Sequence, residues 1–92
     1  MMYIRVKWIH ALSDEPVLLY SELDGDHWEV RKIEIFADER MGYASPGVSV
    51  GSTRLGEEPL PSLQQIASDP QFEPAAITQS EFDAIWAEAT AR

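Results

Sequence analysis

The chain has 92 residues, no cysteine and a net charge of −9, from sixteen Asp and Glu against seven Lys and Arg. This length fits a single domain, 1–92, with one modest core, and the lack of cysteine excludes disulfides, thiolate metal sites and cysteine nucleophiles. The acidic charge disfavours nucleic acid and anionic membrane surfaces as partners. Because no apolar run approaches the roughly 18 residues of a membrane span, we expect a cytoplasmic protein.

The N-terminal part of the sequence predicts three strands. Apolar residues alternate with basic ones across residues 3–10, and this period of two is typical of a half-buried strand. A second strand is predicted at 17–23 and a third at 27–36. The pair Asp24-Gly25 lies between these two and predicts a tight hairpin, because glycine accepts a positive φ without steric cost.

The third predicted strand changes its apolar parity midway. Trp28 and Val30 occupy even positions, whereas Ile33 and Ile35 occupy odd positions. A β-bulge near Arg31-Lys32 would place all four side chains on one face, since a bulge adds one residue and resets the alternation. The alternative is a strand that is apolar on both faces. We favour the bulge.

Residues 37–61 lead from the strands to the helices. A turn at 37–40 is followed by a short fourth strand at 40–44. The stretch 45–61 is rich in proline and glycine and predicts an irregular connection, with room for a short strand at 53–55. Long loops in compact domains often carry function, so this connection is a candidate binding region.

Two helices are predicted near the C-terminus. Ser62 and Gln65 have the spacing of a capping box, and Pro70 requires this first helix to end by Asp69. Thr78 and Glu81 form a second capping box, after which apolar residues recur at helical spacing. The order of elements predicts an α+β fold, a four-stranded antiparallel β-meander followed by an irregular loop and two C-terminal helices packed on one sheet face.

Seven short segments form a composite pattern, namely Trp8-Ile9-His10, Asp14-Glu15-Pro16-Val17, Tyr20-Ser21-Glu22, Glu29-Val30-Arg31-Lys32, Gly42-Tyr43-Ala44, Thr53-Arg54-Leu55-Gly56-Glu57 and Pro61-Ser62-Leu63. Together they resemble a bacterial family of small single-domain proteins that is known as a domain of unknown function. The resemblance covers nearly the whole chain and implies an autonomous bacterial domain, without catalytic or ligand residues to carry over. Asp38-Glu39 departs from the Asp-Gly of the pattern, which favours a longer turn or a type I turn there.

The two histidines, His10 and His27, each lie at the end of a predicted strand. Metal binding or base catalysis needs partners that converge on one point, and no metal-binding or hydrolase motif occurs. We therefore predict no metal and no cofactor, and we interpret both side chains as ordinary hydrogen-bonding residues. The competing hypothesis is an enzyme that uses His10 with Glu22 or Arg54.

The segment from Gly51 to Gly56 brackets two hydroxyls and the guanidinium of Arg54. Such a loop can offer backbone N–H groups and a bidentate fork to an anion. Thr53 and Arg54 are therefore candidate binding residues. We favour the alternative, in which Arg54 pairs with one of the many carboxylates of the same chain.

Charged side chains follow one another along the hairpin of the second and third strands. Glu22 and Glu29 have the composition of a paired-carboxylate hydrolase site. We favour the alternative, in which Glu22, Glu29 and Glu34 form cross-strand ion pairs with Arg31 and Lys32 on a solvated face.

Most of the large aromatic side chains are predicted to fill the core. Trp28, just after the Asp-Gly turn, is the candidate for an exposed aromatic that anchors a partner. Acidic side chains on the loops are expected to gather beside it and attract a basic partner: Asp14, Glu15, Asp24, Asp26, Glu57 and Glu58.

These patterns predict a non-enzymatic protein-interaction module of a bacterial cell, with an inhibitor or immunity-type role toward a basic partner as its specific form. The alternative function is a small-molecule or anion-binding domain that uses the 45–57 loop with Arg54.

Overall fold

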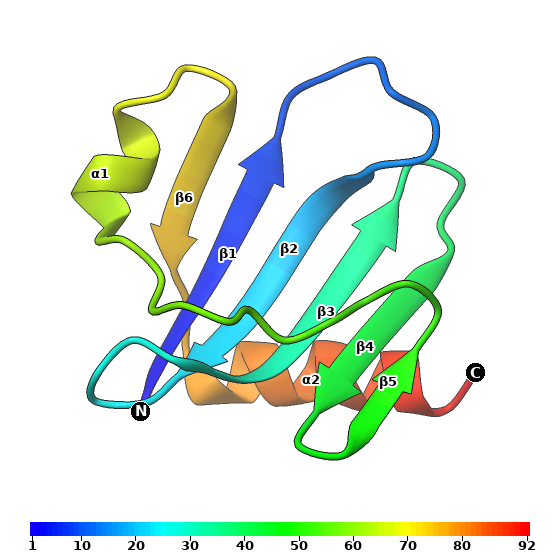
Figure 1. Ribbon diagram of the computed structural model, residues 1–92. Coiled ribbons are helices and arrows are strands. Elements are labelled where there is room, and N and C mark those ends of the chain that lie inside the picture. Colours follow the sequence, from blue (N-terminus) through cyan, green and yellow to red (C-terminus); the bar gives the residue numbers. More distant parts are fainter.

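The computed structural model, which describes residues 1–92, contains one six-stranded antiparallel sheet and two helices (Figure 1). The strand order is β5-β4-β3-β2-β1-β6. The elements are β1 (Met2–Trp8), β2 (Pro16–Leu23), β3 (Glu29–Phe36), β4 (Met41–Ser45), β5 (Val48–Val50), α1 (Leu63–Ala67), β6 (Phe72–Ala76) and α2 (Gln79–Thr90). The α+β class and the sequential pairing of the first four strands are confirmed.

The sheet has six strands where four were predicted. Residues 48–50 form β5, instead of the predicted strand at 53–55. Residues 72–76 form β6, which pairs with the free edge of β1. Proline is tolerated on an edge strand, where its missing N–H breaks no ladder bond with a second neighbour. Pro74 and the lack of apolar alternation therefore hid a strand that forms by pairing with β1.

The β2–β3 and β3–β4 hairpins have the same kind of turn, closed by one backbone hydrogen bond and ending in a residue with positive φ. The His27 amide donates to the Asp24 carbonyl at 3.0 Å, and His27 has φ 66°. The Glu39 amide donates to the Phe36 carbonyl at 2.9 Å, and Glu39 has φ 71°. A type I turn followed by one left-handed residue is a common hairpin connection. The bond from Glu39 to Phe36 fits the type I turn, one of the two alternatives expected there. The predicted role of Gly25 is wrong, because His27 carries the positive φ.

A β-bulge lies at Val30, one residue before the predicted position. Leu23 pairs with Glu29 and Glu22 pairs with Arg31, so Val30 has no partner on β2. The bulge resets the alternation of β3 and brings Glu29 and Lys32, three residues apart, onto the same face. Trp28 lies before the strand, so it does not join Ile33 as predicted.

The predicted caps of both helices are present. The Gln65 amide donates to the Ser62 hydroxyl at 3.2 Å, and the Ser62 amide donates to Gln65 Oε1 at 2.9 Å. The same reciprocal pair joins Thr78 and Glu81. Neither helix has the length and apolarity needed to cross a membrane.

The two helices lie on opposite faces of the sheet, so the prediction of a common face is wrong (Figure 1). Tyr3 and Ile4 are neighbours in β1 and point to opposite sides. Phe82 of α2 packs in the cluster of Tyr3, whereas Leu63 of α1 packs against the cluster of Ile4. The chain changes sides because β6 carries it round the sheet edge. We call the side under α2 the helix face and the other side the strap face.

Candidate functional site

The segment between β5 and α1, residues 51–61, crosses the strap face and is called the strap below (Figure 1). Its first anchor is Thr53, whose hydroxyl donates to Glu34 at 2.8 Å. The strap approaches closely because β4 offers Gly42 at this point, where a Cβ would lie 2.2 Å from Thr53 Oγ1. Thr53 is 0% exposed and cannot reach a ligand, contrary to its prediction as a binding residue.

The second anchor of the strap is the buried carboxylate of Glu29. Its Oε2 accepts from the Ser21 hydroxyl at 2.8 Å, and its Oε1 accepts from the Gly56 amide at 2.7 Å. The Lys32 ammonium lies 3.5 Å from Oε1, and the Glu29 side chain is 3% exposed. A carboxylate this deep needs such partners, because an unpaired buried charge is strongly destabilising.

The third anchor places the strap beside the hairpin of β2 and β3. The Leu60 amide donates to the His27 carbonyl at 2.8 Å. Residues 57–59 therefore lie between an anchor at His27 and an anchor at Glu29. Trp28 is the residue between these two anchors, and it is 41% exposed. Trp28, the candidate for an exposed aromatic, is therefore exposed in the structure.

Acidic residues of both the turn and the strap lie near Trp28 in the fold. Asp24 Oδ1 accepts from the Trp28 amide at 3.0 Å and from the Asp26 amide at 2.9 Å, so these residues form one ordered turn. Glu57 and Glu58 are exposed on the strap alongside it. Met1 is exposed at the same end of the sheet, since Met2 pairs with Leu23. We call this set the Trp28 surface: Met1, Asp24, Asp26, Trp28, Glu57 and Glu58.

Two of the six acidic residues that were expected to gather lie elsewhere. Asp14 and Glu15 precede β2, whereas Asp24 follows it, so the two groups lie at opposite ends of this strand. An eight-residue strand is about 26 Å long. The predicted clustering of loop carboxylates therefore holds for the Trp28 surface alone.

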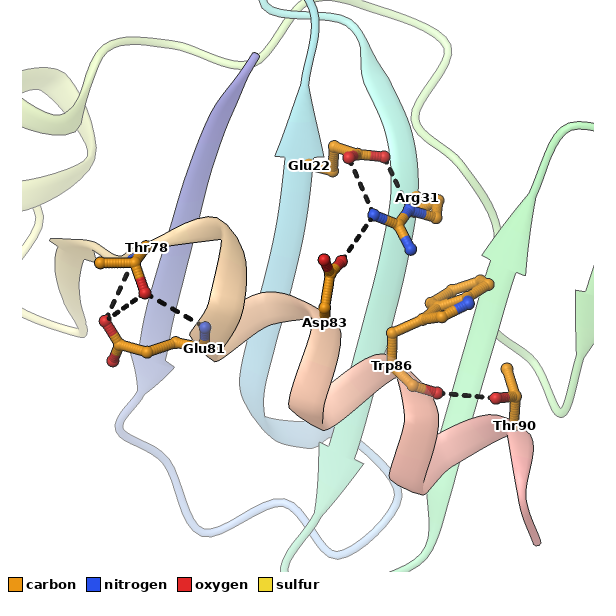
Figure 2. Close-up of polar contacts among 7 residues, drawn as sticks. All are labelled: Glu22, Arg31, Thr78, Glu81, Asp83, Trp86 and Thr90. Atoms are coloured by element: carbon orange, nitrogen blue, oxygen red, sulfur yellow. Dashed lines mark hydrogen bonds and ion pairs between the residues drawn. The ribbon is translucent and has the colours of Figure 1, made fainter.

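Glu22 belongs to a polar network on the helix face (Figure 2). Arg31 donates to both Glu22 oxygens, at 2.7 and 2.9 Å, and to Asp83 of α2 at 3.0 Å. The bond from Arg31 holds the pKa of Glu22 below its ordinary value, and the same bond raises the pKa of Arg31. Burial raises the pKa of Tyr3, which lies next to Glu22.

This network is a structural tie between sheet and helix. The Arg31 guanidinium lies 4.8 Å from the ring centroid of Phe82 and 5.1 Å from that of Trp86. The favoured cross-strand ion pair between Glu22 and Arg31 is confirmed. We expected this pair on a solvated face of the sheet, but α2 covers it. Glu29 lies on the other face, so Glu22 and Glu29 form no carboxylate pair.

His10 makes only local contacts. The Leu12 amide donates to Nδ1 at 2.9 Å, so Nε2 carries the proton and donates to the Pro16 carbonyl at 2.8 Å. Its ring packs on the edge of Trp8. Glu22 lies at the other end of β2 from Pro16, so the structure does not bring His10 and Glu22 together.

Arg54 has no carboxylate partner, so the predicted internal ion pair is absent. Its guanidinium donates to the Ser49 hydroxyl, which in turn donates to the Thr53 carbonyl. Arg54 lines a shallow hollow of about 370 Å³ with Ser45 and Ser49. No three His, Asp or Glu side chains converge on a metal-sized site.

A deeper groove of about 380 Å³ lies on the strap face, between the sheet, the end of the strap and α1. Most of its lining is apolar: Ile4, Val6, Leu19, Leu60, Ile66 and Phe72. Its polar lining comes from the sheet, from α1 and from the turn that follows α1: Ser21, Glu29, Lys32, Gln65 and Asp69.

The model of one protein family, a domain of unknown function (DUF6881), matches residues 2–91. The chain belongs to this family. The match runs from β1 to α2, so the resemblance found in the sequence is confirmed over every element of the fold. No curated protein and no solved structure shows significant similarity to the chain.

The groove of this DUF6881 domain was missed by sequence reasoning, although one signal pointed to it. Ser21 lies between Leu19 and Leu23 on the same face of β2, and is the polar member of an otherwise apolar row. A buried hydroxyl in such a row needs a partner. Its partner, Glu29, could be found only once the bulge at Val30 was located.

Proposed function

We propose that this DUF6881 domain is a non-enzymatic protein-interaction module that binds a basic partner at the Trp28 surface. The observation that carries the proposal is the 41% exposure of Trp28 between acidic residues of the turn and of the strap. Exposed carboxylates speed the arrival of a basic partner through long-range attraction. A large aromatic side chain then supplies the apolar contact that keeps the partner bound.

The Trp28 surface is ordered before any partner arrives. Asp24 Oδ1 fixes the backbone of Trp28, and the Asp24 amide donates to the Trp28 carbonyl at 3.0 Å. The strap is held on both sides of Glu57 and Glu58, by Gly56 and by Leu60. A pre-ordered surface loses less conformational entropy on binding, which favours affinity.

The partner implied by this chemistry presents Lys or Arg side chains around a shallow apolar depression that receives the Trp28 ring. A basic enzyme or toxin has such a surface, and binding there would make the domain an inhibitor or immunity-type protein. The proposed setting is the cytoplasm of a bacterium.

The test is capture of partners from a bacterial lysate at low and moderate salt, with matched variants. Trp28→Ala removes the exposed ring, and Leu12→Ala removes an exposed apolar side chain from the β1–β2 loop. Glu57→Gln with Glu58→Gln removes two charges from the surface, whereas Asp14→Asn with Glu15→Gln removes two at the other end. We expect the wild-type protein to capture a partner of high isoelectric point. The Trp28→Ala variant and the Glu57→Gln, Glu58→Gln variant should lose this partner, whereas the two control variants should retain it. Equal capture within both pairs would refute the proposal.

A second candidate function is anion binding at Arg54, which is favoured by the lack of any carboxylate partner for this guanidinium. A bound oxyanion would complete its bidentate fork. Thermal shift assays with phosphate, nucleotides and carboxylates test this candidate. A stabilising shift that Arg54→Ala abolishes supports it, and the absence of any shift with these anions removes it.

A further inference from the structure

Lys32 is the charged group of the groove whose hydrogen-bond donors are unused. Its side chain is 17% exposed, and its nearest carboxylate oxygen, Glu29 Oε1, lies at 3.5 Å. That distance is beyond a normal N–H···O bond, and no other group of the protein accepts from the ammonium. An ammonium has three N–H donors. Every fully buried polar side-chain atom has a partner, so the Lys32 nitrogen is not fully buried, and Lys32 is one of the residues that line the groove.

The charges around Lys32 indicate what it can bind. Glu29 lies beside it and offsets its positive charge, while both Glu29 oxygens are already engaged by Ser21 and Gly56. Asp69 adds a negative charge to the groove lining, and the whole chain carries −9. Glu29 and Asp69 therefore disfavour an anion in the groove, and the ammonium of Lys32 disfavours a cation in contact with it. A neutral oxygen acceptor satisfies the free N–H donors without either penalty.

We propose that the groove binds a small, uncharged, amphipathic molecule of the acyl amide class. Its carbonyl oxygen accepts from Lys32, and its hydrocarbon body lies over Leu19 and Ile4 towards Phe72. Lys32 and Ile4 both pair with Ser21, so they lie about 10 Å apart across three strands at the usual strand spacing, and Leu19 is two residues from Ser21 along β2. The volume of about 380 Å³ lies in the range of small-molecule pockets, roughly 300–1,000 Å³.

Gln65 supplies a second polar contact at the α1 wall. Its amide oxygen accepts from the Ser62 backbone in the capping box, which fixes the orientation of the side chain. Its NH₂ group has no partner in the protein and is free to donate to the ligand. The groove shares no residue with the Trp28 surface, so this inference stands or fails independently of the proposed function.

The test is an NMR titration of the ¹⁵N-labelled protein with octanamide, octanoate and octylamine. We expect octanamide to shift the amide signals of Leu19, Lys32 and Ile66, and to shift the ammonium signal of Lys32. Octanoate and octylamine share the hydrocarbon body and should bind about tenfold more weakly, because each places a charge where it is repelled.

Lys32→Met should weaken octanamide binding about tenfold, the effect of losing one hydrogen bond to a charged group. Lys7→Met is the matched control, since Lys7 is the other lysine of the chain and is exposed on β1 outside the groove. If Lys32→Met does not fold, the inference is tested by whether octanamide shifts the Lys32 ammonium signal in the wild-type protein. The inference is overturned if octanamide leaves these signals unmoved, if octanoate or octylamine binds as tightly, or if Lys32→Met binds like the wild type.

Discussion

The two faces of the sheet are covered by different kinds of structure. On the helix face, α2 satisfies its own backbone, so its side chains are free to pack, and Phe82 lies with Tyr3 and Ile33 in one cluster. On the strap face, residues 51–61 form no regular series of backbone hydrogen bonds among themselves. Their amides and hydroxyls bond instead to Glu29 and Glu34, which the sheet must supply.

This difference shows what an irregular cover requires of the sheet below it. Backbone groups that leave water need partners, so polar side chains appear on a face that would otherwise be apolar. The strap and α1 also cover that face incompletely and leave the groove open. We therefore expect stability to be concentrated on the helix face, whereas both the groove and the Trp28 surface are formed with the strap.

The largest effect is expected from Phe82→Ala. Phe82 is 0% exposed and lies 5.4 Å from Tyr3 between ring centroids, so truncation leaves a cavity at the centre of the helix face. We expect a loss of about 3–5 kcal/mol in the free energy of unfolding, measured by urea denaturation. Leu12→Ala, at an exposed loop position, is the control. A denaturation midpoint like that of the wild type would show that the helix face is not the main core.

A smaller effect is expected from Gly42→Ala, which acts on the strap face. The added Cβ would lie 2.2 Å from Thr53 Oγ1 and 3.0 Å from the Val50 carbonyl, so the strap must move and the bond from Thr53 to Glu34 is lost. Overpacking of this kind costs about 1–3 kcal/mol. Gly25→Ala is the control, since nothing lies within 4 Å of its Cβ. Equal stability of the two variants would contradict the close approach of the strap.

The smallest effect is expected from Glu22→Gln, and it depends on pH. The pKa of Glu22 is lowered from 4.5 in the folded protein, mainly by its bond from Arg31. Its stabilisation is therefore complete above pH 4.5 and is lost as the pH falls through the folded-state pKa. We expect Glu22→Gln to lose about 1.5 kcal/mol at pH 7, and to approach the wild type in stability below pH 4.5.

Glu88→Gln is the control for this variant, because Glu88 pairs with Arg92 in an exposed position. Exposed pairs contribute little. Chemical denaturation of the three proteins between pH 2 and pH 7 makes the comparison. A difference between Glu22→Gln and wild type that stays constant across this range would show that the Glu22 carboxylate is not the titrating group.

Local signals in the sequence predicted the parts of the fold that local physics determines. The caps at Ser62 and Thr78 were found because each needs only a partner three residues away. The strand β6 was missed because it depends on the free edge of β1, about seventy residues earlier. The left-handed residue of the first turn was assigned to Gly25, because composition cannot show that His27 is held in this conformation beside Leu60.

The candidate sites divide in the same way. Trp28 was chosen as the candidate for an exposed aromatic because it directly follows the Asp-Gly turn. Thr53 was taken for a binding residue because a hydroxyl in a glycine-rich loop gives no sign of its burial. The groove and the free ammonium of Lys32 depend on where the strap crosses the sheet, and no local pattern gives that path.

Native-state hydrogen exchange tests most directly the claim that the helix face carries the stability and the strap is a separate, weaker cover. We predict that the Gly56 and Leu60 amides exchange through local opening, at a rate insensitive to low denaturant, while ladder amides of β2 and β3 exchange only through global unfolding. If instead the Gly56 and Leu60 amides show the same protection and the same denaturant dependence as the ladder amides, the strap is part of the cooperative core and the claim is wrong.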